Sequence, residues 1–348
     1  MAAYERKPDF TRLDKVLRRG GEPDCVPFYE LFSDVEIMEA ILQRPMSDEA
    51  RVSYQLRMGY DYVNAGYGFG YPRRTRKVKD IAPLPRNERS FVDDNHGTIE
   101  NRKDFDEYPW PVVSDEVFRN VYDMERMLPD GMKILLSAGG GILENVVWLM
   151  GYMPFSYALQ DDEQLIWDMF EKIGTNTTAV LKRALELADR GKAGAVVQGD
   201  DMGYNKATML SPEMMRKFVF PWTKKLVELA HAYDLPYILH SCGNLEEVMD
   251  DLIDDVGIDA KHSYEDKIMP VGAFKRKYGG RIAVLGGVDV DYLCMHDEGD
   301  VREYVARVLG ECMPGGGYAL GSGNSLANYV PIPNIHAMYD VGRTKGIY

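Results

Sequence analysis

His240 and Cys242 stand two residues apart, where the apolar run that begins at Leu235 gives way to Gly243 and Asn244. Side chains at positions i and i+2 of an extended backbone face the same side. The imidazole and the thiol can therefore converge on one ion, and both are preferred zinc ligands. The alternative is a small buried thiol beside a histidine that is hydrogen-bonded to a backbone carbonyl. A zinc site needs further ligands from other parts of the chain.

Eight short β-like runs, separated by helix-like segments, must position these two side chains. That count predicts an α/β fold, a single (β/α)₈ TIM barrel over residues 1–348, whereas a doubly wound sheet would need fewer strands in two halves. Ser211-Pro-Glu predicts a helix start, because serine is a good N-cap and proline fits the first turn. The eight runs begin at Val26, Tyr60, Lys133, Gly194, Tyr237, Ala260, Ile282 and Gly317.

Residues 68–112 interrupt this alternation after the second run. The segment predicts an insertion with small strands of its own. Long connections inside compact domains are commonly lids or binding loops, so we expect a lid or a binding loop here. Its basic run, from Arg73 to Lys79, is typical of a solvated face and could also dock an acidic partner.

Polar and acidic residues collect at the C-terminal ends of the predicted strands, where barrel enzymes build their active sites. We assign acid/base or orienting roles to Asp200, Asp201 and Glu265, although adjacent acids could instead cap a helix or form ion pairs. Gly139–Gly141 predicts a tight turn into a helix, or backbone N–H groups close to an anion. The predicted substrate-binding residues are Glu30, Asn64, Tyr204 and Asn324, and the candidate further metal ligands are Glu30, Asp200, Glu265 and Asn324.

Composition excludes several classes of function. The formal charge of −14 over 348 residues argues against nucleic-acid binding. The sequence shows no membrane-length apolar run and no signal-peptide pattern at its start. Four cysteines in a chain of this length do not indicate a disulfide framework, so we expect a cytoplasmic protein.

Several motifs, in order from about residue 24 to the C-terminus, resemble the uroporphyrinogen decarboxylase superfamily, a family of (β/α)₈ barrels. One branch of that superfamily comprises true decarboxylases, which carry an N-terminal Arg-Gln-Ala-Gly-Arg stretch that Arg18-Arg-Gly-Gly-Glu does not match. The other branch comprises cobalamin-dependent methyltransferases with a His-x-Cys zinc motif. The matching motifs are Asp200-Asp-Met-Gly-Tyr, Ser211-Pro-Glu, His240-Ser-Cys-Gly-Asn, Tyr278-Gly, Gly286-Gly-Val-Asp, Gly315-Gly-Gly-Tyr and Asn334-Ile-His-Ala-Met.

The resemblance implies a zinc-assisted methyltransferase, the substrate-activating component of an O-demethylase, with zinc on His240, Cys242 and an acid. Asn324 stands where the coenzyme M enzymes of this branch have another cysteine, which argues against that subgroup. The Asp-x-His-x-x-Gly motif of corrinoid modules is absent; Cys294-Met-His-Asp-Glu-Gly lacks the aspartate. The methyl group of a small-molecule donor, such as a methoxylated aromatic, would therefore pass to a separate corrinoid protein.

Two other functions stay open. One is a metal-free decarboxylase or related lyase acting on a tetrapyrrole-like or smaller acid, which would need a ring of arginines that the strand ends lack. The other is a non-catalytic binding barrel. The sequence allows a homodimer and does not define the oligomeric state.

Overall fold

The computed structural model describes residues 6–66, 69–84, 86, 88–93 and 95–348. Residues 1–5, at the start of the chain, lie outside the described part. So does Gly68, the first residue of the predicted insertion, and the same holds for Pro85, Asn87 and Asp94 within it.

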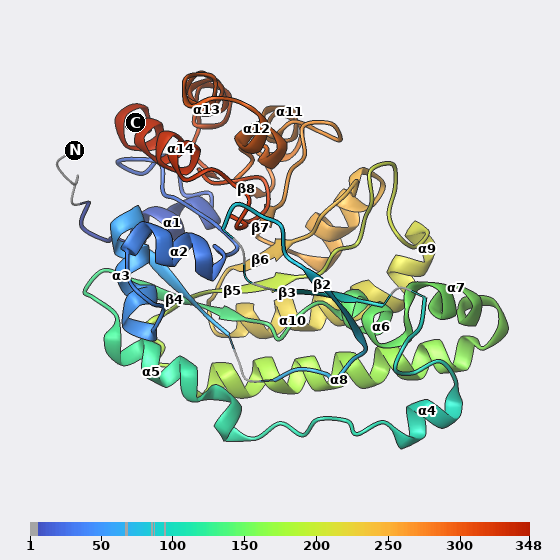
Figure 1. The fold of residues 1–348 in the computed structure, drawn as a ribbon. Coiled ribbons are helices and arrows are strands. Elements are labelled where there is room, and N and C mark those ends of the chain that lie inside the picture. The colour runs from blue at the N-terminus through green and yellow to red at the C-terminus, as the bar shows by residue number, and fades with distance from the viewer. Residues whose placement is uncertain (1–5, 67–68, 85, 87, 94) are drawn as a thin grey trace.

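Seven parallel strands form one curled sheet in the order β1-β4-β5-β6-β7-β8-β9 (Figure 1). Helices connect successive strands, as parallel pairing requires. The α/β barrel predicted from the sequence is therefore confirmed. The strands are β1 (Tyr62–Ala65), β4 (Lys133–Ser137), β5 (Ala193–Gly199), β6 (Tyr237–His240), β7 (Ala260–His262), β8 (Ala283–Leu285) and β9 (Tyr318–Ala319).

The first of the eight predicted strands, which begins at Val26, joins the sheet through a bridge of Phe28 to Leu320 instead of a full ladder. Tyr29 N–H donates to the Leu320 carbonyl at 2.8 Å, and Leu320 N–H donates to the Pro27 carbonyl at 2.9 Å. Pro27 has no N–H of its own, so the ladder cannot extend through it on the donor side. On the other flank, the Tyr62 hydroxyl accepts from the backbone N–H and donates to the backbone carbonyl of residue 30, both at 2.8 Å.

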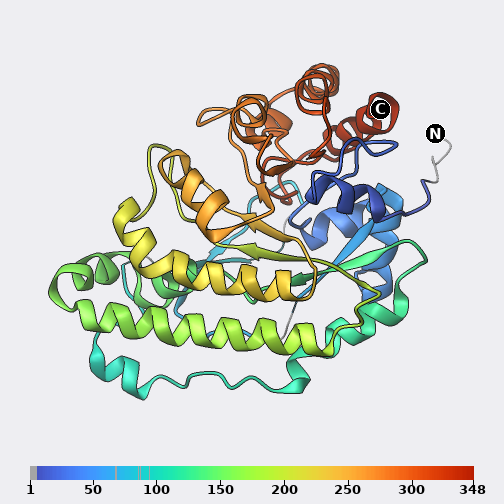
Figure 2. The same ribbon diagram turned by 180° about the vertical axis from the view of Figure 1, so that it is seen from behind.

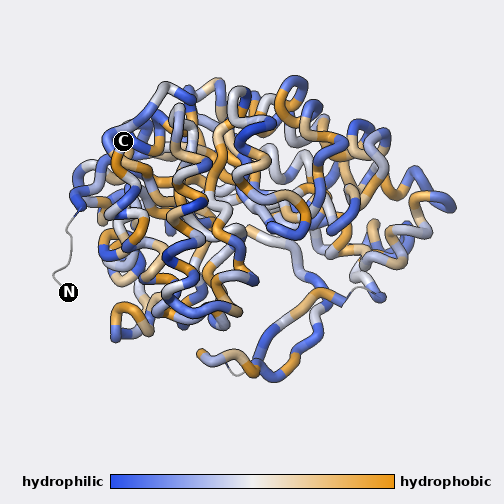
Figure 3. The backbone as a smooth tube through the Cα atoms, turned by 90° about the horizontal axis from the view of Figure 1, so that it is seen from above, coloured by the Kyte–Doolittle hydropathy of each residue, from blue (hydrophilic) through white to orange (hydrophobic). Residues whose placement is uncertain are grey.

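Helices cover the outside of the sheet, and α8 and α10 run side by side along it (Figures 1 and 2). Hydrophobic and hydrophilic residues alternate along the coils of the chain (Figure 3), which is typical of helices with one face on a core. Up to β4 the helices are α1 (Thr11–Leu17), α2 (Val35–Leu42), α3 (Asp48–Met58), α4 (Arg102–Glu107), η1 (Asp115–Phe118) and α5 (Arg119–Met127). Up to β6 they are α6 (Ile142–Met150), α7 (Tyr152–Asp161), α8 (Glu163–Leu187), α9 (Pro212–Met214), η2 (Met215–Val219) and α10 (Phe220–Ala232). After β6 they are η3 (Glu246–Val248), η4 (Asp251–Val256), α11 (Val271–Tyr278), α12 (Val290–Met295), α13 (Glu298–Cys312) and α14 (Ile332–Lys345).

The predicted helix start at Ser211 is confirmed, because its Oγ accepts from Met214 N–H at 3.2 Å. The same segment continues through a π-helical turn into α10. Within the part of the chain that the structure describes, no helix is long and apolar enough to span a membrane.

The insertion after β1 contains an antiparallel hairpin of β2 (Thr75–Lys79) and β3 (Glu88–Val92). Asn328, in the loop after β9, donates from Nδ2 to Asp80 Oδ2 and to the Leu84 carbonyl, both at 2.7 Å. Farther along, Thr98 N–H donates to the Leu149 carbonyl at 2.6 Å. The insertion therefore bridges the loop after β9 and the end of α6.

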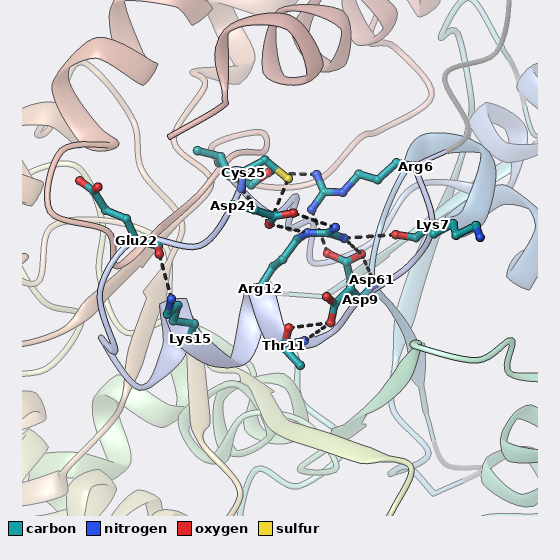
Figure 4. A network of polar contacts seen from close by, with 11 residues as sticks. Arg6, Lys7, Asp9, Thr11, Arg12, Lys15, Glu22, Asp24, Cys25 and Asp61 are labelled. Carbon is teal, nitrogen blue, oxygen red and sulfur yellow. Dashed lines mark hydrogen bonds and ion pairs between the residues drawn. The ribbon is translucent and has the colours of Figure 1, made fainter.

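A buried ion cluster ties the N-terminal segment to the start of β1 (Figure 4). Asp61, whose side chain is 1% exposed, lies 3.0 Å from Arg6 and 3.5 Å from Arg12. It also accepts from Asp9 N–H at 2.8 Å. Asp61 precedes β1 and so lies at the end of the strand opposite the usual barrel active site, where interactions serve stability.

Candidate functional site

Asp201, His240 and Cys242 come together just beyond the C-terminal ends of β5 and β6. Cys242 Sγ lies 3.5 Å from His240 Nε2, so the side chains at i and i+2 do converge. Asp201 Oδ1 lies 3.8 Å from the same nitrogen. Among the described residues, these three offer one ligand atom each within 4.8 Å of one another.

This donor set fits a zinc ion. Zinc bonds of about 2.0–2.3 Å place tetrahedral ligand atoms roughly 3.3–3.8 Å apart. The Sγ–Nε2 separation of 3.5 Å lies within that range, and the Oδ1–Nε2 separation of 3.8 Å lies at its upper end. The Asp201 side chain is 40% exposed whereas that of His240 is 6% exposed, so one side of the cluster opens to solvent. Three protein ligands and an open position are typical of a catalytic zinc site.

Asp201 was not among the four residues predicted to complete the ligand set. The reason is local. The neighbouring Asp200 faces the other way and is fully buried, and its two carboxylate oxygens accept from three backbone N–H groups at the start of α6, at 2.9, 3.2 and 3.0 Å. Asp200 is thus a helix cap, the structural alternative considered for it, and its acid/base role remains a prediction.

Tight glycine packing holds the loops that carry the cluster. Gly243 has φ +83°, and a Cβ there would lie 2.1 Å from the Gly203 carbonyl carbon. The close approach lets Cys242 N–H donate to Asp201 Oδ1 at 2.9 Å. The two loops of the site are therefore locked together by backbone contacts.

The Cys242 sulfur is surrounded by hydrogen-bond donors. Asn324 Nδ2 donates to it at 3.2 Å and Ser263 Oγ at 3.4 Å. Ser263 holds this place with φ +86°, a strained value for a residue with a side chain. Burial, and then the Asp201 charge, raises the pKa of the Cys242 thiol to about 12. A bound cation would be needed to keep the sulfur as thiolate, and the two donors suit that charge.

Glu144, in the first turn of α6, was missed by sequence reasoning. It shares a cavity with Asp201. Burial and the charges of Asp200 and Asp201 raise the pKa of its carboxyl to about 9. A carboxyl that stays protonated at neutral pH can donate a proton. The only hint in the sequence is that Glu144 follows closely after the Gly139–Gly141 segment. The tight turn predicted for that segment is confirmed, because Gly139 and Gly140 have φ +88° and +94°.

Glu30 is turned into the protein. Its carboxylate accepts from Ser322 N–H and Ser322 Oγ, both at 2.6 Å, and from Tyr339 OH at 2.8 Å. These bonds connect the first segment of the barrel to the chain beyond β9. Burial raises the pKa of Glu30 to about 7, and the three bonds oppose that rise. Its predicted contact with substrate stays a prediction.

Glu30 is expected to make stability depend on pH. The pKa of Glu30 is about 7 in the folded state and lower in the unfolded state, so protonation of Glu30 stabilises the fold. This stabilisation is complete at pH values below the unfolded-state pKa. This stabilisation should be lost as pH rises through about 7, by an amount on the order of 3 kcal/mol. Glu30→Gln imitates the protonated acid, so urea midpoints should fall less between pH 5 and 8 in the variant. Parallel pH profiles for the variant and the parent would contradict this, and Glu107→Gln, at an exposed site, is the control.

Asn64 lies near the end of β1, and Tyr204 lies in the loop after β5. Asn64 Nδ2 donates to the Leu31 carbonyl at 2.6 Å, and its Oδ1 is buried with no hydrogen-bond partner in the described residues. Tyr204 is 54% exposed, and its carbonyl accepts from Asn244 N–H at 2.8 Å. Asn64 Oδ1 and the Tyr204 phenol are the groups left for a ligand, and both roles remain predictions.

Glu265 and Asn324 follow β7 and β9. Glu265 is partly exposed and lines a cavity together with Lys261, Ser263 and the loop after β6. It is not one of the three clustered ligands. Asn324 reaches the cluster through the Cys242 sulfur. The structure therefore brings together Asp201, His240, Cys242 and Asn324 of the predicted residues.

One cavity reaches the cluster, and a second cavity adjoins the first. One, of about 430 Å³, reaches Asp201 and is otherwise lined by Leu143, Glu144, Val147, Trp148, Tyr152 and Met209. The other, of about 510 Å³, shares Trp148 and is walled by Phe69–Arg73 of the insertion and by the glycine turn after β4. Volumes of this size are typical of small-molecule pockets. Arg73 stacks over the Trp148 ring at 4.2 Å where the two cavities meet.

A parallel α/β barrel with reactive side chains beyond its strand ends belongs to the class of barrel enzymes. Residues 96–344 match the family described as uroporphyrinogen decarboxylase (URO-D). The match spans well over half of the chain, and the protein belongs to that family.

Individual relatives are distant. The uroporphyrinogen decarboxylase of Alkalilimnicola ehrlichii is 23% identical over 254 residues, which cover 70% of this chain and 66% of that protein, just under two thirds of its length. A methyltransferase from Methanosarcina mazei has a similar structure, with a TM-score of 0.72 at 15% identity over 97% of this chain and 99% of that one. A candidate vitamin-B12-independent methionine synthase from Listeria monocytogenes reaches a TM-score of 0.50 at 12% identity over 92% and 98%. At such identities the structural likeness shows the shared fold alone.

Proposed function

We propose that the protein is a methyltransferase that moves a methyl group from a methylated small molecule to a separate corrinoid protein. The observation that carries the proposal is the Asp201–His240–Cys242 cluster, whose ligand separations suit zinc. The M. mazei protein that shares this fold is a methyltransferase, so the fold is compatible with such a reaction. Zinc bound there would act as a Lewis acid on the atom that carries the methyl group.

The surrounding residues would bind the donor and supply a proton. The cavity beside Asp201 has aromatic and aliphatic walls, which suit a flat, largely apolar donor such as a methoxylated aromatic. Glu144, which shares that cavity and whose pKa is raised chiefly by burial, would protonate the oxygen as its bond to the methyl carbon breaks. The insertion walls the adjoining cavity and would cover the donor as a lid.

Decarboxylation is the second candidate. The curated relative is a uroporphyrinogen decarboxylase. In addition, Arg73 forms no ion pair with any residue in the described part of the chain. It lines the cavity of about 510 Å³, where it could hold a carboxylate. A decarboxylase would need no metal in the cluster.

One experiment separates the two functions. The purified protein is incubated with zinc, a reduced corrinoid protein and methoxylated aromatics, and corrinoid methylation is followed by its visible spectrum. A parallel incubation of metal-free protein with uroporphyrinogen and smaller acids measures CO₂ release. Zinc-dependent methylation without CO₂ release is expected, and CO₂ release by the metal-free protein with no methylation would overturn the proposal.

A further inference from the structure

His262, at the end of β7, forms a histidine pair with the metal-ligand candidate on β6. His262 Nδ1 lies 2.8 Å from His240 Nδ1, and both rings are buried. On its other side, His262 Nε2 lies 3.2 Å from the Ser322 carbonyl oxygen. A carbonyl oxygen only accepts hydrogen bonds, so Nε2 of His262 must carry a hydrogen.

The direction of the second hydrogen bond follows from the first. A neutral imidazole protonated at Nε2 has its lone pair at Nδ1, so His262 accepts there and His240 Nδ1 donates. Neutral His240 then keeps its lone pair on Nε2, the atom that faces Cys242 Sγ and Asp201 Oδ1. Both rings are buried, and in the described part of the chain the hydrogen-bond partners of His262 are His240 and the Ser322 carbonyl, so no carboxylate lies against its ring to balance an imidazolium charge.

Two neighbours hold the His262 ring in place. Tyr29 meets the ring edge-on, with centroids 4.9 Å apart. Gly286, at φ +78°, leaves room for the ring, because a Cβ there would lie 2.8 Å from His262 Nε2 and 2.3 Å from the Ser322 oxygen. The bond from His262 to Ser322 is therefore built into the packing of β7 against β8.

We propose that His262 is a positioning residue for the metal centre: it holds His240 in the Nδ1–H tautomer and thereby directs the Nε2 lone pair toward Asp201 and Cys242. The role rests on the proposed zinc site and goes beyond its three ligands. Hydrogen bonds to the far nitrogen of a metal-bound histidine fix its tautomer and orientation, and losing one typically lowers metal affinity about 10- to 100-fold.

The tautomers can be read in the metal-free protein by long-range ¹⁵N–¹H NMR after labelling its 6 histidines. We expect a hydrogen on Nδ1 of His240 and on Nε2 of His262, with the pair assigned from the spectrum of His262→Asn. A hydrogen on Nε2 of His240 would overturn the inference. Because this measurement needs neither zinc nor a reaction, its result is separate from that of the methyl-transfer assay.

Zinc affinity, measured by chelator competition, gives the second test. His262→Leu removes the acceptor and should weaken zinc binding about 10- to 100-fold, whereas His262→Asn, whose side-chain oxygen can replace Nδ1, should restore most of it. His296→Leu, at an exposed histidine, is the matched control. Unchanged zinc affinity in folded His262→Leu would overturn the inference, and if that variant does not fold, the tautomer measurement decides.

Discussion

Replacing Cys242 with alanine is expected to weaken zinc binding by more than about 100-fold and to abolish methyl transfer. The lower bound follows because even a residue that only hydrogen-bonds to a ligand contributes about 10- to 100-fold to affinity, and Cys242 would be a ligand itself. Its sulfur lies 3.5 Å from His240 Nε2 and is enclosed by donors from Ser263 and Asn324. Elemental analysis, chelator competition and the corrinoid assay measure the three effects.

The matched control is Cys294→Ala, at a half-buried free cysteine outside the cluster. It should keep wild-type metal content and activity. Stoichiometric zinc with full affinity in Cys242→Ala would show that the metal lies elsewhere. Full methyl transfer by a zinc-free Cys242→Ala protein would instead remove the metal from the proposed reaction.

Replacing Asp61 with alanine is expected to lower the free energy of unfolding by about 3–5 kcal/mol, the range for breaking a buried ion pair on one side. The Asp61 and Arg6 side chains are only 1% and 6% exposed, so Arg6 would keep a buried charge without its anion. The Asp9 N–H would lose its acceptor as well. Urea denaturation with an unchanged m-value is the measurement.

Asp24→Ala tests the same cluster from its exposed side. Asp24 bonds Arg12 through Nε at 2.7 Å and Nη2 at 3.0 Å, but its side chain is 64% exposed (Figure 4). Exposed ion pairs contribute about 0–1 kcal/mol, so this variant should lose far less stability than Asp61→Ala. Equal losses in the two variants would show that burial is not what makes Asp61 matter. Zinc affinity should be unchanged in both variants, since the Asp201–His240–Cys242 cluster lies at the opposite end of the strands from Asp61.

Local patterns in the sequence were enough for the fold and for two of the three residues of the metal cluster. The alternation of β-like runs with helical segments predicted the strands of the barrel. It could do so because the formation of a strand, or of a capped helix such as the one that starts at Ser211, depends mainly on residues close together in the sequence. The i and i+2 spacing predicted that His240 and Cys242 converge, because side-chain direction in an extended chain depends only on parity. Local propensity could not show that the segment around Pro27 would join the sheet through a single bridge and not through a full ladder.

Only the tertiary structure decided which residues complete the site. Asp200 and Asp201 are neighbours in sequence, yet one caps α6 and the other faces Cys242, and that choice depends on where α6 begins relative to β5. Glu144 and His262 have no motif of their own; one gains its raised pKa and the other its partner from strands and helices distant in sequence. His240 and Cys242 could therefore be named from their spacing, whereas their third ligand and the tautomer of His240 depend on contacts that exist only once the barrel is folded.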